Sequence, residues 1–255
     1  MLAIIGGTGL TQLANLNITR REVVRTPYGD PSGALTFGEI NGNEVVFIAR
    51  HGYGHTIPPH EINYRANIWA LAQQKVRGIV AVASVGGIRE DLPPGTVVIP
   101  DQIIDYSWAR KHTYFEGADR PVTHVDFTLP FSPDLREEIL RAVRGVANCA
   151  RDGGVYACTQ GPRLETKAEI KRIENDGGDM VGMTGMPEAA LARELGVPYA
   201  MLAVVSNWAA GKHDSATEIH LDAANDAFAA AMKKVHKILE CMSGACTPCH
   251  MTMGN

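Results

Sequence analysis

Short runs of apolar residues recur along the whole chain and predict the strands of a sheet. Several runs are apolar throughout rather than alternating with polar residues, which is typical of strands covered on both faces. The runs are Leu2–Ile5, Val45–Ile48, Gly78–Ala83, Val97–Ile99, Val155–Cys158, Met180–Gly182 and Tyr199–Val205.

Segments with a helical spacing of apolar residues separate many of these runs. Pro133–Ala147 follows Ser132, a suitable N-cap, and Pro187–Leu195 begins with a proline, which is favoured at the first position of a helix. The other predicted helices are Tyr64–Gln74, Lys167–Asn175 and a long terminal helix, Thr217–Met242. This alternation predicts a single α/β domain with a central, largely buried mixed β-sheet flanked by helices. We expect the domain to span residues 1–242 and residues 243–255 to form a C-terminal tail.

Polar residues follow four of the predicted strands, and in α/β folds ligands gather at the carboxyl ends of strands. Gly6-Gly7-Thr8-Gly9 follows the first strand and Arg50-His51-Gly52 closes the second, while Ser84 and Thr184 follow two others. Glycine amides, hydroxyl groups and an arginine together suit a phosphate dianion. The alternatives are a purely structural glycine turn and a surface arginine with a local ion pair.

The composition and net charge of the chain argue against several classes of function. The chain has 255 residues, of which 45% are hydrophobic and 20% charged, as in ordinary globular proteins. Its net charge of −4, without a basic run, argues against a nucleic-acid or anionic-membrane partner. No segment approaches the ~20 apolar residues of a membrane span, and we expect a reduced, cytoplasmic protein. The tail motif Cys246-Thr-Pro-Cys249-His250 has the spacing of c-type haem attachment, but without an export signal we expect no haem there.

Six motifs, in order along the chain, carry a family resemblance. They are Gly6-Gly7-Thr8-Gly9, Ala49-Arg50-His51-Gly52, Asn63–Leu71, Pro100-Asp101-Gln102, Gly161-Pro162-Arg163 and Met183–Glu188. With them the chain resembles the trimeric purine nucleoside phosphorylases, specifically the methylthioadenosine phosphorylase branch. The resemblance implies phosphorolysis, in which a purine nucleoside and phosphate give a free purine and a pentose 1-phosphate. It also implies a homotrimer with active sites at subunit contacts, and no metal or organic cofactor, inorganic phosphate being the co-substrate.

The resemblance also implies roles for individual residues. Met183 would pack on the ribose, and His124 would approach the 5′ end of the sugar from a neighbouring subunit. Methylthioadenosine enzymes usually have a threonine where this chain has Ala83, so a hydroxyl is missing there and the backbone takes its place. The implied phosphate ligands are Thr8, Arg50, His51, Ala83, Ser84 and Thr184.

The base-binding residues depart from those of adenine-specific members, which end the relevant strand with Asp-x-Asp. This chain has Asn207 and Ala209 there. An amide donates and accepts at once, so Asn207 can donate to O6 of a 6-oxopurine and accept from its protonated N7. Glu165, beside Leu164, can accept the hydrogen on N1 of a 6-oxopurine, whereas N1 of adenine is a lone pair. The 6-oxopurine phosphorylases also have Glu and Asn at these places. Arg50, Asn207 and Glu165 are the predicted catalytic residues; a turn-capping Asn207 and a solvated Glu165 are the alternative.

The sugar end depends on the last predicted helix. Inosine and guanosine phosphorylases place a histidine near the 5′-hydroxyl, whereas methylthio-specific members have small apolar residues there. Matched to the family, Leu221 and Ala224 of this helix would face the pocket. If the match were shifted by one residue, His220 would face it instead. Similarity to the methylthio branch favours a 5′-methylthio group. The expected substrate is S-methyl-5′-thioinosine.

Four other functions are the alternatives. Two are related reactions: phosphorolysis of inosine and guanosine, and phosphorolysis of methylthioadenosine. A nicotinamide-dependent oxidoreductase would need the G-x-G-x-x-G spacing, which the first glycine turn lacks. A non-catalytic nucleoside-binding module would not need the complete set of phosphate ligands.

Overall fold

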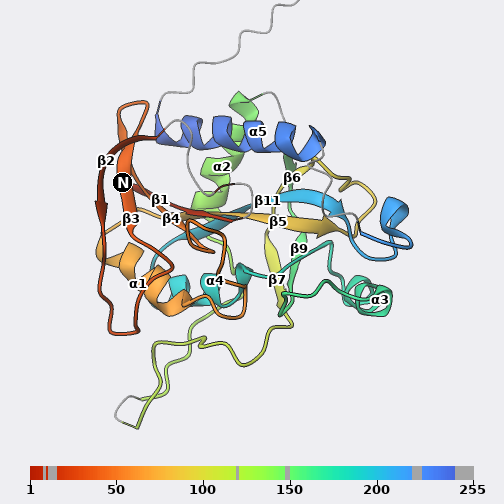
Figure 1. The fold of residues 1–255 in the computed structure, drawn as a ribbon, viewed down its shortest axis with the longest axis horizontal. Helices are drawn as coiled ribbons and strands as arrows, with labels where there is room; N and C mark the ends of the chain where they lie inside the picture. The colour runs from red at the N-terminus through yellow and green to blue at the C-terminus, as the bar shows by residue number, and fades with distance from the viewer. Residues whose placement is uncertain (8–9, 11–15, 119–120, 147–149, 220–225, 245–255) are drawn as a thin grey trace, which may run out of the picture.

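The computed structural model describes residues 1–7, 10, 16–118, 121–146, 150–219 and 226–244 (Figure 1). Within these residues the chain forms a mixed sheet of eleven strands. The strands are β1 (Leu2–Gly6), β2 (Asn17–Glu22), β3 (Leu35–Ile40), β4 (Asn43–Ala49), β5 (Ile79–Gly87), β6 (Val97–Ile99), β7 (Gln102–Asp105), β8 (Ala150–Asp152), β9 (Val155–Cys158), β10 (Met180–Gly182) and β11 (Tyr199–Trp208). The helices are α1 (Tyr64–Gln73), α2 (Pro133–Gly145), α3 (Lys167–Asn175), α4 (Gly185–Glu194) and α5 (Asp226–Ser243), with one 3₁₀ turn, η1 (His213–Ser215).

β5 is the central strand of this sheet. It pairs in parallel with β1 and with β11, both of which have a residue opposite Ile79. Its carboxyl end pairs antiparallel with β10, where Met180 lies opposite Gly87. Because β1 and β4 are also parallel, the carboxyl ends of β1, β4, β5 and β11 point the same way. Residues that follow these strands therefore meet at one edge of the sheet.

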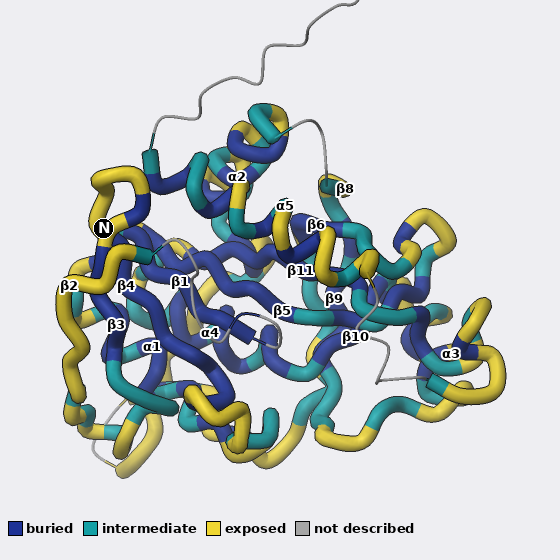
Figure 2. Tube along the Cα trace, turned by 45° about the horizontal axis from the view of Figure 1, so that its top comes forward, coloured by how far each residue is buried: buried dark blue, intermediate teal, exposed yellow. Residues whose placement is uncertain are grey.

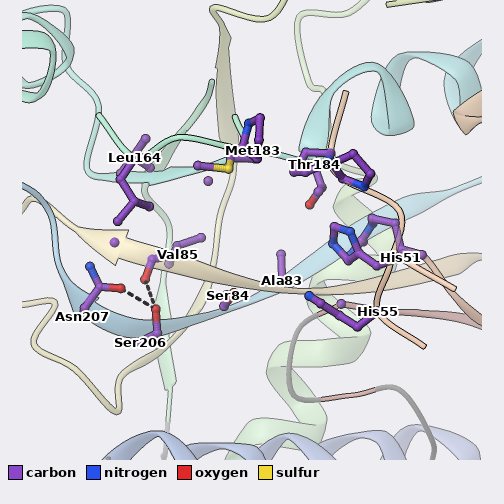
Figure 3. Close-up of a pocket in the computed structure, with 18 of the residues that line it drawn as sticks. His51, His55, Ala83, Ser84, Val85, Leu164, Met183, Thr184, Ser206 and Asn207 are labelled. Carbon is purple, nitrogen blue, oxygen red and sulfur yellow. Dashed lines mark hydrogen bonds between the residues drawn. The ribbon is translucent and has the colours of Figure 1, made fainter. Parts of the chain in front are cut away.

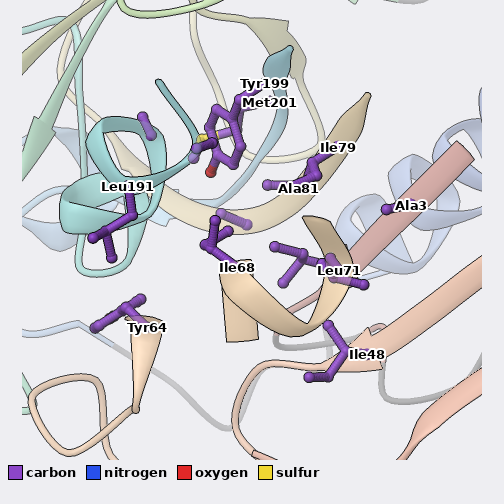
Figure 4. Close-up of a cluster of buried hydrophobic side chains, with 14 of the residues drawn as sticks. Ala3, Ile48, Tyr64, Ile68, Leu71, Ile79, Ala81, Leu191, Tyr199 and Met201 are labelled. Atoms are coloured by element: carbon purple, nitrogen blue, oxygen red, sulfur yellow. The ribbon is translucent and has the colours of Figure 1, made fainter. Parts of the chain in front are cut away.

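The helices cover the sheet on both faces. In Figure 1, α2 and α5 lie on one side of the sheet, and α1 and α4 lie on the other. The α1 side contains Ile68 and Leu71, which pack against Ile79 and Ala81 of β5 (Figure 4). β1 is buried along its whole length and β5 and β11 along most of theirs, whereas β2 is exposed (Figure 2). This double cover explains why the strand sequences are apolar throughout.

The predicted fold class is confirmed: the described chain is a single α/β domain with a large mixed sheet flanked by helices. All seven predicted apolar runs are strands. The four strands that the pattern missed, β2, β3, β7 and β8, are edge or partly exposed strands with mixed polarity, such as Asn-Ile-Thr-Arg-Arg-Glu in β2.

The prediction of a terminal helix starting at Thr217 was wrong, since residues 217–219 are not helical and the described helix begins at Asp226. The helix predicted from Pro187 begins two residues earlier, at Gly185, across a kink at Met186.

Candidate active site

A cavity of about 730 Å³ lies at the carboxyl ends of β4, β5, β10 and β11 (Figure 3). With the exception of His124, every predicted site residue that the structure describes lines this cavity. These residues are Arg50, His51, Ala83, Ser84, Leu164, Glu165, Met183, Thr184, Asn207 and Ala209. His124 is exposed and does not line the cavity of its own chain. Thr8 and Leu221, with Ala224 and His220, lie outside the described residues.

Arg50 is the buried cation of the site. Its side chain has no exposed surface, and it donates from Nε and Nη2 to the two carboxylate oxygens of Glu188 at 2.7 and 2.9 Å. Nη1 donates to the carbonyl oxygen of Val82 at 3.1 Å. A guanidinium has five N–H groups, so two remain for an anion in the cavity. Burial acts to lower the pKa of Arg50, but the charge and hydrogen bonds of Glu188 outweigh it and hold the pKa above its ordinary value.

Glu188 itself was missed as a functional residue, although it ends one of the family motifs. It is fully buried in α4 and also accepts a hydrogen bond from the Tyr199 hydroxyl at 2.7 Å. Arg50 and Glu188 are 138 residues apart in the chain, so no local pattern links them. The available signal was chemical: an arginine buried at a strand end needs a counterion.

Gly7 is required for the close approach of Arg50 to the strand ends. A Cβ atom at this position would lie 2.7 Å from the carbonyl oxygen of Val82 and 2.8 Å from Nη1 of Arg50. Both distances are below 3.0 Å, so a side chain at this position would force the Val82 carbonyl group or the Arg50 guanidinium to move. The second glycine of the Gly6-Gly7-Thr8-Gly9 motif therefore makes room for the guanidinium.

His51 is a neutral acceptor beside this cation. Its Nδ1 lies 2.8 Å from the carbonyl oxygen of Ile57, so this nitrogen carries the hydrogen and Nε2 keeps a lone pair. Burial, and next the positive charge of Arg50, lower the pKa of His51 to about 4. The ring of His55 lies 4.7 Å from that of His51 and lines the same cavity (Figure 3). A neutral acceptor next to a cation suits the P–OH group of monohydrogen phosphate.

Glu165 also lines the cavity, beside Leu164 and away from Arg50 and His51. Burial raises the pKa of its carboxyl group, and a hydrogen bond from the Thr159 hydroxyl, 2.5 Å from Oε1, opposes this rise. Glu165 is thus half-buried, and its carboxyl group accepts a hydrogen bond from a protein hydroxyl. Thr166, not Glu165, caps the following helix through a capping box with Glu169.

Asn207 lines the same end of the cavity, after a bulge in β11. Val205 lies opposite Val85 and Asn207 lies opposite Gly86, so Ser206 is an extra residue in the strand. The Ser206 hydroxyl donates to Oδ1 of Asn207 at 2.7 Å, and Nδ2 of Asn207 donates to the carbonyl oxygen of Trp208 at 2.7 Å. An amide oxygen has two lone pairs and its nitrogen two hydrogens. One acceptor and one donor thus remain for a purine.

Two further apolar residues, Ile219 and Phe228, line the cavity near the start of α5. They flank the segment on which the predicted Leu221 lies. Trp208, by contrast, is buried outside the cavity and contacts His213, with the ring centroids 4.1 Å apart and the ring planes tilted by 37°. This aromatic residue is part of the packing.

Arg110, which the motifs did not indicate, ties together the two loops that bear ligands. It is buried, and its Nη2 donates to the carbonyl oxygens of Thr159 and Gln160 at 3.1 and 2.8 Å. Nη1 donates to the carbonyl oxygens of Met183 and Met186. Its Nε also donates to the side-chain oxygen of Gln160 at 3.2 Å, and among the described residues it binds no side chain that lines the cavity.

The described residues contain no group of three or more histidine, cysteine or acidic side chains placed to hold a metal ion. Within the same residues, no helix is long and apolar enough to cross a membrane. The groups that line the cavity are donors, acceptors and one cation, a set that binds anions and heterocycles by hydrogen bonds.

The fold and the residues that line this cavity are those of a nucleoside phosphorylase, and the sequence comparisons lead to the same class of protein. The chain belongs to the phosphorylase superfamily, whose family model matches residues 1–242. The resemblance that the motifs indicate is thereby confirmed.

Individual relatives are similar over most of their length. A protein of Pseudomonas syringae pv. tomato named "Probable S-methyl-5'-thioinosine phosphorylase" is 55% identical over 210 residues, covering 82% of this chain and 85% of the relative. The 6-oxopurine nucleoside phosphorylase of Pyrococcus furiosus is 47% identical over 215 residues, covering 82% and 80%. Among solved structures, methylthioadenosine phosphorylase from Schistosoma mansoni in complex with adenine has a TM-score of 0.89 at 31% identity, covering 95% and 90%.

Proposed function

We propose that this protein catalyses the phosphorolysis of 6-oxopurine nucleosides and that its preferred substrate is S-methyl-5′-thioinosine. The products are hypoxanthine and 5-methylthioribose 1-phosphate. The observation that carries the proposal is the division of one cavity into two ends. Arg50, His51 and Thr184 line the end suited to an anion, and Glu165 and Asn207 line the end suited to a purine.

The reaction follows from this division. An oxygen of phosphate forms a bond to C1′ while the C1′–N9 bond breaks and its electron pair leaves with the purine. Arg50 and the hydroxyls of Ser84 and Thr184 hold the phosphate, whose negative charge stabilises the cationic sugar of the transition state. Asn207 and Glu165 hydrogen-bond to the departing base, which takes up a proton from solvent at N7, while the P–OH group of the new phosphate ester releases one to solvent. The reaction as written needs no metal, organic cofactor or covalent enzyme intermediate.

Base selection rests on hydrogen-bond polarity. A 6-oxopurine presents an acceptor at O6 and a donor at N1, which match the Asn207 amide and an ionised Glu165. Adenine presents the opposite groups at both positions. A buried mismatch of this kind discriminates by about 10⁴–10⁵. Two relatives with 6-oxopurine or thioinosine in their names, at 47% and 55% identity, support this choice.

We assign the 5′ substituent of the sugar from the apolar residues that line the cavity near the start of α5. Ile219 and Phe228 offer no hydrogen bond to a 5′-hydroxyl, whereas a thioether sulfur needs none. The test is a comparison of kcat/KM for S-methyl-5′-thioinosine, S-methyl-5′-thioadenosine, inosine and guanosine. We expect the first to lead. A clear preference for inosine would overturn the 5′ assignment alone, and a preference for the adenine compound would overturn the base assignment.

We further propose that the protein is a homotrimer in which His124 of one subunit reaches the sugar end of the next. Supporting this, the described parts of the connection between β7 and α2, residues 106–118 and 121–132, extend away from the sheet (Figure 1) and expose Trp108, Val122, Val125 and Leu129. Exposed apolar side chains gathered in one segment are typical of an interface.

Analytical ultracentrifugation tests the trimer. Val122 is 80% exposed in this loop and Val23 is 79% exposed elsewhere, which makes a matched pair. We expect wild type and Val23→Asp to sediment at three times the chain mass and Val122→Asp to sediment as smaller species. A monomeric wild type, or a Val122→Asp trimer as stable as the control, would contradict this assembly.

A further inference from the structure

Thr159 holds the carboxyl group that faces the purine, and neither the motifs nor the resemblance assign it a role. It directly follows β9, and its main-chain N–H donates to the carbonyl oxygen of Gly182 at 2.8 Å. Its hydroxyl lies 2.5 Å from Oε1 of Glu165 and 3.4 Å from the Gly182 carbonyl oxygen. The hydroxyl has one hydrogen, and the much shorter distance assigns it to Glu165.

The charged groups around Glu165 do not replace this hydrogen bond. Arg163, the cation that acts on Glu165, forms two hydrogen bonds with Glu169 at 2.8 and 2.7 Å, and its side chain is 69% exposed. Glu169 itself is a like charge that raises the pKa of Glu165. The Nε atom of Arg172, in the following helix α3, lies 3.7 Å from a carboxylate oxygen of Asp176. Arg163 and Arg172 thus each have another carboxylate as a partner.

The geometry leaves one oxygen of Glu165 for the substrate. Glu165 is the residue shared by the nucleoside cavity and a second cavity of about 300 Å³, whose wall includes Thr159. The Thr159 hydroxyl approaches Oε1 from that second side. In our proposed function Oε2 is the oxygen that accepts the N1–H group of a 6-oxopurine in the nucleoside cavity.

We propose that Thr159 is a positioning residue for base selection: its hydroxyl fixes Oε1 of Glu165, keeps the carboxylate in its ionised form and leaves Oε2 to accept the N1 hydrogen of a 6-oxopurine. This proposal rests on the proposed function. A hydrogen bond to the ionised form stabilises that form relative to the protonated one. Without it, burial is opposed by the main-chain N–H of Glu165 itself and by the exposed Arg163, both of which lower the pKa less than the Thr159 hydroxyl does. We expect loss of the hydroxyl to raise the pKa of Glu165 further, because burial then loses its largest opposing contact.

The experiment compares Thr159→Val, which keeps the shape, with Thr159→Ser, which keeps the hydroxyl. kcat/KM for S-methyl-5′-thioinosine is measured from pH 5 to 9, together with the ratio of kcat/KM for inosine to that for 1-methylinosine, which lacks the N1 hydrogen. Thr159→Val should move the acid limb to higher pH and lower the ratio about tenfold. Thr159→Ser should restore both.

The matched control is Thr113→Val, because the Thr113 hydroxyl donates to Oε1 of Glu194 at 2.7 Å outside the cavity. It should change neither the acid limb nor the ratio. If Thr159→Val does not fold, Thr159→Ala is measured in the same way. The inference is overturned if a folded Thr159→Val or Thr159→Ala variant keeps the acid limb of its kcat/KM profile at the wild-type pH and keeps the wild-type ratio of inosine to 1-methylinosine. A wild type that does not cleave 6-oxopurine nucleosides at all instead overturns the proposed function.

Discussion

Replacing Glu188 by glutamine tests the buried ion pair that holds the phosphate-binding arginine. The carboxylate of Glu188 accepts three hydrogen bonds: from Arg50 Nε at 2.7 Å, from Arg50 Nη2 at 2.9 Å and from the Tyr199 hydroxyl at 2.7 Å. A glutamine side chain has a single acceptor oxygen and an NH₂ group. Whichever way the amide is turned, at least one N–H of Arg50 or the tyrosine hydroxyl faces another donor.

The magnitude follows from burial, since both side chains of the pair have no exposed surface. Removing one partner of a buried ion pair costs about 3–5 kcal/mol, because the other charge stays buried without compensation. In a domain of this size each kcal/mol corresponds to roughly 2–4 °C in Tm. We therefore expect Glu188→Gln to lower Tm by roughly 6–20 °C. Because Arg50 loses its fixed orientation, we also expect KM for phosphate to rise about tenfold, or ~1.4 kcal/mol.

The assay is thermal and urea unfolding at pH 7 and at one protein concentration, with Glu138→Gln as the control. Glu138 also forms two hydrogen bonds with an arginine, Arg77, at 2.6 and 2.7 Å, but the Arg77 side chain is 42% exposed. Breaking such a surface pair costs about 0.2–1 kcal/mol. If the two variants lose the same small free energy of unfolding and KM for phosphate does not change, Glu188 is not the anchor of the phosphate site.

Three further predictions concern the cavity. Gly7→Ala should raise KM for phosphate about tenfold with a smaller effect on kcat, because the new Cβ displaces Arg50; equal phosphate kinetics in both proteins would contradict this. Glu165 should be required in its ionised form, and its pKa is raised by burial. kcat/KM for 6-oxopurine nucleosides should therefore fall as the pH falls through a pKa above the ordinary glutamate value, and Glu165→Gln should lack this acid limb. Asn207→Asp should raise kcat/KM for S-methyl-5′-thioadenosine relative to S-methyl-5′-thioinosine, and an unchanged ratio in steady-state assays would refute base selection at this position.

The elements that the sequence predicts well are those that are buried on both faces. Continuous apolar runs predicted the strands from Leu2 and from Tyr199 because no other element buries such a run in so few residues. The exposed strand at Asn17–Glu22 has no such pattern, since its stability comes from pairing with β3. The start of α5 was predicted too early, at Thr217, because a polar segment before a helix has the same pattern whether it forms a loop or the first helical turn.

The cavity residues could be predicted where they follow an apolar run or lie in or beside a family motif. The strand ends at Arg50, Ser84 and Asn207 meet as parallel topology requires. Glu188 and Thr159 were not predicted, because their roles depend on contacts with residues that the sequence pattern does not place beside them. Chemical reasoning about an unpaired buried charge indicates that such partners exist, but only the fold identifies them.

The most direct test of the central claim is the ratio of kcat/KM for S-methyl-5′-thioinosine to that for S-methyl-5′-thioadenosine, measured with purified wild-type protein and with phosphate either present or omitted. The two substrates differ only in the purine groups that Asn207 and Glu165 face. We predict hypoxanthine release that depends on phosphate and a ratio of about 10⁴ or more. Release without phosphate, or a ratio below one, would contradict the account.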